Sequence, residues 1–326
     1  MPVFHSNFLP TIPFRNGHFN TMYRPLFMKD KANYTRKRIT TWDNDFIDLD
    51  FSFVNSKTLV LLIHGLEGSS ESKYIASNTN HLNSKNIDTV CFNLRGCSGE
   101  DNVLLSTYHS GKTEDVDFVV NHLIKNYTYQ NIIIVGFSLG GNLTLKYLGE
   151  KSDQISPKVK GGIAVSVPID IGSSEQEMDK LKNKLYMEVF FKTMKNKILE
   201  KSHKFPEYKL DKDKLFKATK FKHLEELYTV PIFGFDSPED YWQKASSKPY
   251  LLKIKVPTLL VNAKDDTFLS NQCYPYQEAE NSDYFFFEET KYGGHCGFMT
   301  SFKPNENRWL EHRIYRFIKE NIQIDI

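Results

Sequence analysis

Cysteine is scarce in this sequence, and its spacing excludes the usual structural uses of the residue. The four cysteines among the 326 residues are Cys91, Cys97, Cys273 and Cys296. They form no C-x-x-C pair and are too sparse for the disulfide scaffold of a small secreted protein. We therefore expect reduced thiols in a cytosol-like compartment and no zinc site.

Long apolar runs are also absent. The longest runs, such as Leu59–Ile63, fall far below the roughly 20 residues that a membrane-spanning helix needs. The opening segment, MPVFHSNFLP, lacks the basic stretch and long apolar stretch of a signal peptide. The sequence thus predicts neither a signal peptide nor a transmembrane helix, and we expect a cytoplasmic protein.

A large excess of one charge sign is missing as well. The formal net charge of +2 is too small to attract nucleic acid or membrane to the whole molecule. The local exception is Glu175–Lys222, which holds 14 lysines, no arginine and 8 acidic residues. We interpret these lysines as the solvated face of a helical region and expect no nucleic-acid partner. Weak peripheral contact with anionic lipid stays open as an alternative.

The sequence does contain buried strands that alternate with helices. Phe46–Phe53 alternates apolar and polar residues, and the turn residues before it predict a hairpin with Lys37–Trp42. Later apolar runs lack alternation, as strands buried on both faces do; they are Thr58–Ile63, Thr89–Leu94, Asn131–Val135, Gly162–Val167, Thr258–Val261 and Tyr284–Phe287. Helical spacing is seen at Tyr74–Ser84, Thr113–Lys125, Leu139–Gly149 and Asn305–Lys319. This order predicts a mostly parallel, doubly wound α/β sheet.

Residues 172–248 interrupt that order with helical patterning and no buried strand. We interpret them as a helical lid inserted after the sixth strand of an α/β core, which is formed by residues 1–171 and 249–326. Apolar residues recur there at three- and four-residue spacing, namely Met187, Phe190, Phe191, Met194 and Ile198. The resulting apolar helix face has two possible locations: packed on the core, or lining an acyl pocket.

A nucleophile motif follows one of the buried strands. The segment Gly136-Phe-Ser-Leu-Gly-Gly141 joins the strand before it to a helix after it. This G-x-S-x-G turn is strained and tightly packed, so glycines are needed beside the serine, whose hydroxyl is raised above the sheet edge. Because no phosphate-binding glycine motif accompanies it, we predict that Ser138 is a catalytic nucleophile.

A serine needs a base and an orienting acid, which follow it along the chain in this type of fold. His295 lies in a glycine-flanked loop after the last strand, whereas His312 falls inside the final helix. Asp265 and Asp266 both follow the preceding strand. We choose Asp266 because the usual G-x-x-D spacing, counted from Ala263, ends there. Asp170 is a remote alternative that we interpret as a turn residue.

Two backbone N–H groups should hold the negative charge that develops on the substrate oxygen. The first belongs to Leu139, which follows the serine. The second is predicted at Leu66, in the loop His64-Gly-Leu-Glu-Gly68, whose glycines permit the turn. We expect His64 itself to hold this loop rather than to take part in catalysis.

With these segments identified, the chain resembles the YheT-type branch of the α/β-hydrolases almost from end to end. The shared motifs are Asn16–Met22, His64–Ser69, Asn93–Glu100, Tyr108–Asp115, Gly136–Asn142, Asn262–Asp266 and Gly293–Phe298. The resemblance implies an α/β-hydrolase fold with Ser138, Asp266 and His295 in the catalytic positions. Substrates in the branch range over medium-chain esters, monoacylglycerols and phospholipids. Thr267 departs from the proline that often follows the acid. We expect no N-terminal membrane anchor of the kind that eukaryotic members often carry.

We therefore hypothesise a serine esterase that cleaves short- to medium-chain or lipid-like carboxylic esters through an acyl-enzyme, without metal or cofactor. One alternative is an alcohol acyltransferase, which differs only in whether water or an alcohol accepts the acyl group. Another is a catalytically silent scaffold that binds a ligand, which is disfavoured because every required residue type is present in order.

Overall fold

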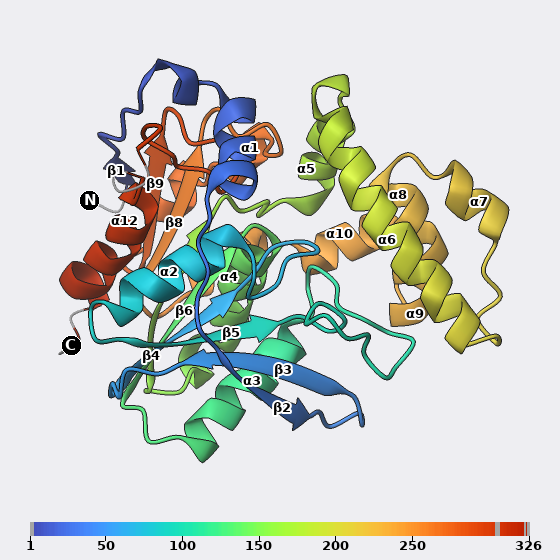
Figure 1. Ribbon diagram of the computed structural model, residues 1–326, viewed down its shortest axis with the longest axis horizontal. Coiled ribbons are helices and arrows are strands. Elements are labelled where there is room, and N and C mark those ends of the chain that lie inside the picture. The colour runs from blue at the N-terminus through green and yellow to red at the C-terminus, as the bar shows by residue number, and fades with distance from the viewer. Residues whose placement is uncertain (1–2, 304–306, 323, 325–326) are drawn as a thin grey trace.

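A nine-stranded sheet runs through the middle of the molecule in the computed structural model, which describes residues 3–303, 307–322 and 324 (Figure 1). The strand order is β1-β9-β8-β7-β6-β4-β5-β3-β2, and only β2–β3 and β3–β5 pair antiparallel. The strands are β1 (Val3–His5), β2 (Thr35–Thr40), β3 (Phe46–Ser52), β4 (Thr58–Ile63), β5 (Asp88–Asn93), β6 (Asn131–Phe137), β7 (Val159–Val165), β8 (Thr258–Ala263) and β9 (Phe285–Thr290). The mostly parallel α/β-hydrolase sheet and its hairpin are confirmed.

Helices cover both faces of the sheet, which explains why its central strands lack alternation. In β4, Leu59 and Leu61 pack with α3 (Thr113–Asn126) and α4 (Leu139–Lys151). Val60 points the other way, to the cluster that holds α2 (Lys73–Asn83) and α12 (Trp309–Phe317). The remaining α-helices are α1 (Gly17–Phe27), α5 (Ile171–Met178), α6 (Lys184–Lys204), α7 (Lys212–Lys217), α8 (Phe221–Leu224), α9 (Val230–Phe233), α10 (Pro238–Ala245) and α11 (Tyr276–Glu280).

The beginning of the chain is more ordered than its proline-containing sequence suggests. It forms β1, which pairs with β9, and the three-turn helix α1. Asn16 caps α1 by accepting a hydrogen bond from the Phe19 N–H (3.0 Å). The sequence did not predict β1, so each predicted strand is numbered one higher in the structure. The predicted sixth strand is therefore β7. Residues 304–306, where the last helix was expected to begin, lie outside the described residues.

Between β7 and β8 the chain forms the helices α5 to α10, which lie to one side of the sheet (Figure 1). The apolar face of α6 is buried largely within this helical segment, where Met187 and Phe191 pack with Leu215 of α7 and Phe221 of α8. The apolar face of α6 is therefore not buried mainly against the core of the sheet. Among the described residues, no helix is both long and apolar enough to cross a bilayer.

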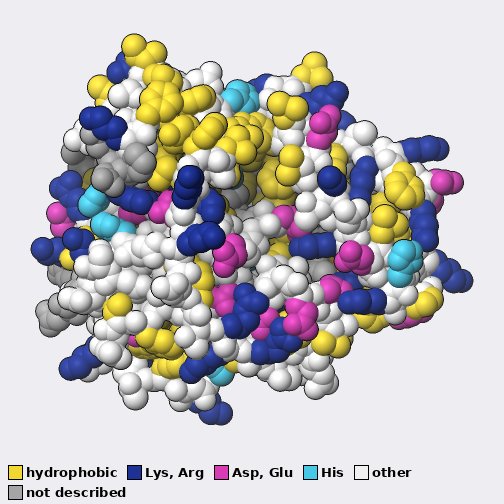
Figure 2. All heavy atoms as spheres, in the orientation of Figure 1, with side chains coloured by type: hydrophobic (Ala, Val, Ile, Leu, Met, Phe, Trp, Pro, Cys, Tyr) yellow, Lys and Arg dark blue, Asp and Glu magenta, His cyan; other side chains and the backbone are white. Residues whose placement is uncertain are grey.

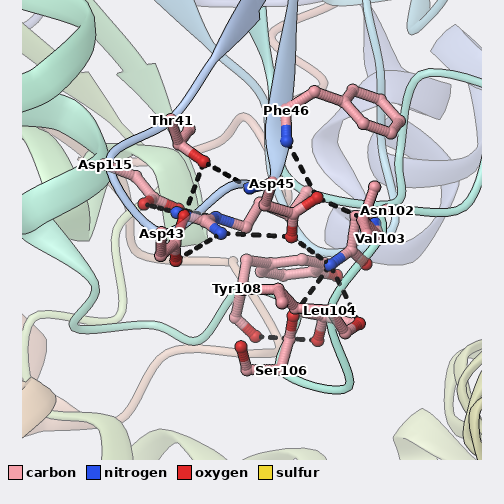
Figure 3. Close-up of polar contacts among 12 residues, drawn as sticks. Thr41, Asp43, Asp45, Phe46, Asn102, Val103, Leu104, Ser106, Tyr108 and Asp115 are labelled. Atoms are coloured by element: carbon pink, nitrogen blue, oxygen red, sulfur yellow. Dashed lines mark hydrogen bonds and ion pairs between the residues drawn. The ribbon is translucent and has the colours of Figure 1, made fainter.

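A buried guanidinium joins the hairpin to the loop after β5. Arg95 donates two hydrogen bonds to Asp115 (2.7 and 2.9 Å) and one each to Asp43 (2.8 Å) and Asp45 (3.1 Å). The three carboxylates surround the guanidinium, and Asp45 also accepts a hydrogen bond from Asn102 (Figure 3). Burial raises the pKa of Asp115, so this carboxylate depends on Arg95 to remain charged.

We predict that Arg95→Met lowers the free energy of unfolding by about 3–5 kcal/mol, because it leaves buried carboxylates without a counter-charge. Urea denaturation of the folded protein measures this loss. The matched control is Arg316→Met, whose exposed pair with Glu320 should contribute less than about 1 kcal/mol. Equal effects of the two substitutions would contradict the structural role of Arg95.

Candidate active site

The turn between β6 and α4 holds Ser138 in a strained conformation. Its φ of 53° lies in the left-handed region, which non-glycine residues rarely adopt. A Cβ on Gly136 would lie 2.1 Å from the Gly140 carbonyl oxygen, and one on Gly140 would lie 2.3 Å from that of Ile63. The glycines are therefore required by close backbone packing, as the motif predicts.

The structure brings Ser138, His295 and Asp266 together. The His295 Nε2 lies 2.9 Å from the Ser138 Oγ, and its Nδ1 lies 2.8 Å from the Asp266 Oδ2. Because a carboxylate only accepts hydrogen bonds, Nδ1 carries the ring proton and Nε2 is free to accept one from the serine. The other Asp266 oxygen accepts from the Phe268 N–H (3.0 Å). The three side chains thus form a continuous chain of hydrogen bonds, called here the hydrogen-bond relay.

Asp265 points elsewhere, so the structure separates the two neighbouring carboxylates. Its Oδ1 accepts a hydrogen bond from the Gly294 N–H (2.8 Å). Burial raises the pKa of Asp265 to about 6, with a smaller contribution from the negative charge of Asp266. Asp170, the remote alternative, caps α5 by accepting from the Ser173 N–H.

Helix α1 holds the loop that carries His295, and sequence reasoning gave this helix no such role. The Thr21 Oγ1 accepts a hydrogen bond from the His295 N–H (2.8 Å). Asn20 donates to the Met299 carbonyl and accepts from the Met299 N–H, and Arg24 donates to the Gly297 carbonyl. The only signal in the sequence was the motif Asn16–Met22, which was recognised by resemblance alone.

The loop after β4 is fixed on both sides of Leu66. The Gly65 N–H donates to the Tyr74 hydroxyl, and the Glu67 N–H donates to the Tyr108 hydroxyl, each at 3.0 Å. Tyr108 returns a hydrogen bond to the Glu67 carboxylate (2.6 Å), which also pairs with Lys197 of α6 (2.9 Å). The amide of Leu66 thus lies in a rigid loop that α6 contacts directly.

His64 is a structural residue of the same loop, as expected. The Leu94 N–H donates to its Nε2 (3.0 Å), so its Nδ1 donates to the Gly65 carbonyl (2.7 Å). Burial lowers the pKa of His64 to about 4, which keeps the ring neutral.

His312 is exposed on α12, and all four cysteines are buried and unpaired.

A cavity of about 1290 Å³ opens at these residues. Its lining includes Ser138, Leu139, His295 and Leu66, and it extends along α6, where Phe190 and Met194 contribute to the wall. The ring of Phe268 lies 4.4 Å from that of His295 and connects the histidine to the aromatic side chains of α6. Within the described residues, no three His, Cys, Asp or Glu side chains gather so that they could hold a metal ion.

Comparison with known proteins identifies the family. A model described as the alpha/beta hydrolase fold matches residues 58–302. The putative esterase YheT of Escherichia coli (strain K12) is 30% identical, with 95% of this chain and 92% of that protein covered. Phospholipase ABHD3 of Homo sapiens is 26% identical, with 99% and 81% covered. Monoacylglycerol lipase of Saccharomyces cerevisiae is 28% identical, with 81% and 60% covered.

Solved structures agree at the level of the fold. The Pyrococcus furiosus esterase Pf2001 superposes with a TM-score of 0.60 at 18% identity, covering 88% of this chain and 91% of that one. The family model spans most of the chain, and the relative at 30% identity extends the match to nearly its whole length. The chain therefore belongs to the α/β hydrolase family.

Proposed function

We propose that this chain hydrolyses carboxylic esters through an acyl-enzyme on Ser138. The observation that carries the proposal is the relay from Ser138 through His295 to Asp266, which lies at the wall of a largely apolar cavity. The relatives named esterase, phospholipase and monoacylglycerol lipase support ester chemistry. The cavity favours short- to medium-chain or lipid-like acyl groups.

The geometry supports a two-stage reaction. The Ser138 oxygen attacks the ester carbonyl while its proton passes to the His295 Nε2, and Asp266 stabilises the imidazolium that forms. The amides of Leu66 and Leu139 hold the resulting oxyanion. His295 then returns the proton to the departing alcohol, which leaves an acyl group on Ser138. A water molecule, deprotonated by His295, attacks this acyl group and releases the acid.

We further propose that residues 172–248 act as a lid over this site. Lys197 on α6 pairs with Glu67, next to Leu66. Phe190 and Met194 line the cavity that contains Ser138. The helical segment therefore contacts both the loop that carries Leu66 and the space where an acyl chain would lie, and it is placed to shape substrate preference.

Replacement of the nucleophile tests the mechanism. Ser138→Ala should abolish hydrolysis of p-nitrophenyl esters and covalent labelling by a fluorophosphonate, because the serine oxygen forms the bond. Circular dichroism and the thermal midpoint should stay close to those of the wild type, since Ser138 contributes little packing. Retained turnover or labelling in a pure, folded variant would reject the acyl-enzyme on Ser138.

The two neighbouring carboxylates provide a matched pair of variants. Asp266→Asn should lower kcat by about 10³-fold or more, because the imidazole loses its orienting and stabilising anion. Asp265→Asn preserves an acceptor for the Gly294 N–H and should change kcat less than about tenfold. Steady-state kinetics on one soluble ester measures both variants, and equal losses or the reverse order would assign the acid differently.

The cavity wall predicts a change in chain-length preference. Phe190→Ala and Met194→Ala should shift kcat/KM toward longer acyl chains, because the wall recedes while the relay is untouched. Reaction with a small fluorophosphonate should be preserved. Phe216→Ala is the control, since Phe216 of α7 is exposed and is not part of the cavity wall. An unchanged chain-length profile in both cavity variants would limit α6 to a packing role.

A further inference from the structure

The mouth of the cavity lies between α1 and α6, and apolar side chains on both helices are left in solvent there. Leu26 of α1 and Leu185 and Val189 of α6 are exposed over 62%, 76% and 67% of their surface. The same three residues line the cavity. A side chain that is both largely exposed and part of the cavity wall lies at the opening, so these residues mark its two sides.

The exposed apolar surface continues outward from the mouth, on α1 and on the short 3-10 helix Leu181–Asn183 that precedes α6. Phe27, beside Leu26, is 61% exposed, and Leu181, four residues before Leu185, is 89% exposed. Figure 2 shows hydrophobic side chains gathered over α1 and along the hollow between α1 and α6. We call Met22, Leu26, Phe27, Leu181, Leu185 and Val189 the apolar rim. Isolated exposed leucines are ordinary, but a continuous patch around a pocket marks an interaction site.

Positive charge borders the rim on the α6 side. Lys182 and Lys192 line the cavity, and Lys184 is exposed with only a distant pair to Glu188 (3.9 Å). Lys180, next to Leu181, and Lys182 both pair with Glu177. The four lysines therefore outnumber the two carboxylates that they pair with, Glu177 and Glu188. Apolar residues flanked by lysines are typical of helices that lie in the interface of a bilayer containing anionic lipid.

We propose that the apolar rim docks on an anionic lipid surface, with the mouth of the cavity facing the acyl chains. The docking itself requires no ester chemistry, whereas its role in delivering an ester to Ser138 rests on the proposed function. A lipid surface fits better than a second copy of this chain, because the rim surrounds an opening to an apolar cavity. A protein partner would close that opening, while a lipid surface covers the rim and supplies apolar ligands through it.

The geometry of the fold permits this docking without rearrangement. At one edge of the mouth, His18 of α1 stacks on Tyr186 of α6 and bonds its hydroxyl (3.1 Å). This contact holds the two helices together while the rim residues stay in solvent. The apolar surface is thus present before any lipid binds.

Vesicle sedimentation tests the proposal with the full chain and with variants that avoid the cavity wall. Phe27→Ser/Leu181→Ser should lower partitioning to phosphatidylcholine/phosphatidylglycerol vesicles at least about tenfold. Its kcat/KM on a soluble short-chain ester should equal that of the wild type, because neither residue lines the cavity. Phe216→Ser, which removes an equally exposed apolar side chain on α7, should leave partitioning unchanged.

A second matched pair of variants tests the electrostatic contribution to docking. Lys184→Glu should weaken binding to vesicles with phosphatidylglycerol and reduce its dependence on salt. Lys214→Glu, at a similarly exposed lysine on α7, should change neither. If the wild type binds none of these vesicles, or if rim and control variants bind equally, the proposal is overturned.

Further outcomes distinguish lipid docking from a protein interface at the rim and from the proposed ester hydrolysis. A dimer of the wild type in size-exclusion chromatography that Phe27→Ser/Leu181→Ser dissociates would make the rim a protein interface and overturn the lipid proposal. Vesicle binding by a wild type that hydrolyses no ester would support the docking and reject the proposed function. Ester hydrolysis without vesicle binding would support the proposed function and reject the docking.

Discussion

The close approach of α1 to the loops after β8 and β9 is the constraint on which the site geometry depends. A Cβ on Gly17 would lie 2.0 Å from the Asp265 carbonyl oxygen, and a Cβ on Gly297 would lie 2.4 Å from the Asn20 carbonyl oxygen. Such contacts leave no room for a side chain at either position. Because the same loops carry Asp266 and His295, a displacement of α1 would alter the relay directly. The buried pair of Arg24 with Glu311 (2.7 Å) ties this assembly to α12.

A second set of contacts divides the helical segment into a fixed part and an exposed part. Near the end of α6, the buried Lys201 donates to the carbonyls of Asn102 and Leu104, in the loop that Arg95 organises (Figure 3). Lys197, one turn earlier, holds Glu67. The first half of α6 is tied instead to α1, through Tyr186 and His18, and it presents Leu185 and Val189 at the mouth. Shape and charge at these exposed positions can therefore vary without disturbing the loop His64–Gly68.

These contacts explain what the sequence could and could not predict. The sheet and the Ser138 turn depend on local signals, namely buried apolar runs and glycines at fixed positions, so both were predictable. Helix α1 was missed because most of its apolar side chains remain exposed, and tertiary hydrogen bonds rather than an apolar face hold it in place. The choice between Asp265 and Asp266 rested on spacing. Only the folded loop shows that Asp266 bonds His295, whereas Asp265 accepts a hydrogen bond from the Gly294 N–H.

Backbone strain concentrates where the proposed chemistry occurs, and the fold supplies the reason it persists. Glu67, Ser138, Ser166 and Cys296 all have φ between 53° and 56°, a conformation that costs free energy in non-glycine residues. Each follows or contacts a central strand, and the Ser166 hydroxyl accepts from the Cys296 N–H (2.9 Å). Strands buried on both faces cannot shift to relieve this strain. The rigid sheet thus stabilises loop conformations that the local sequence alone would not adopt, and these conformations bring Ser138, His295 and the loop that carries Leu66 to the wall of one cavity.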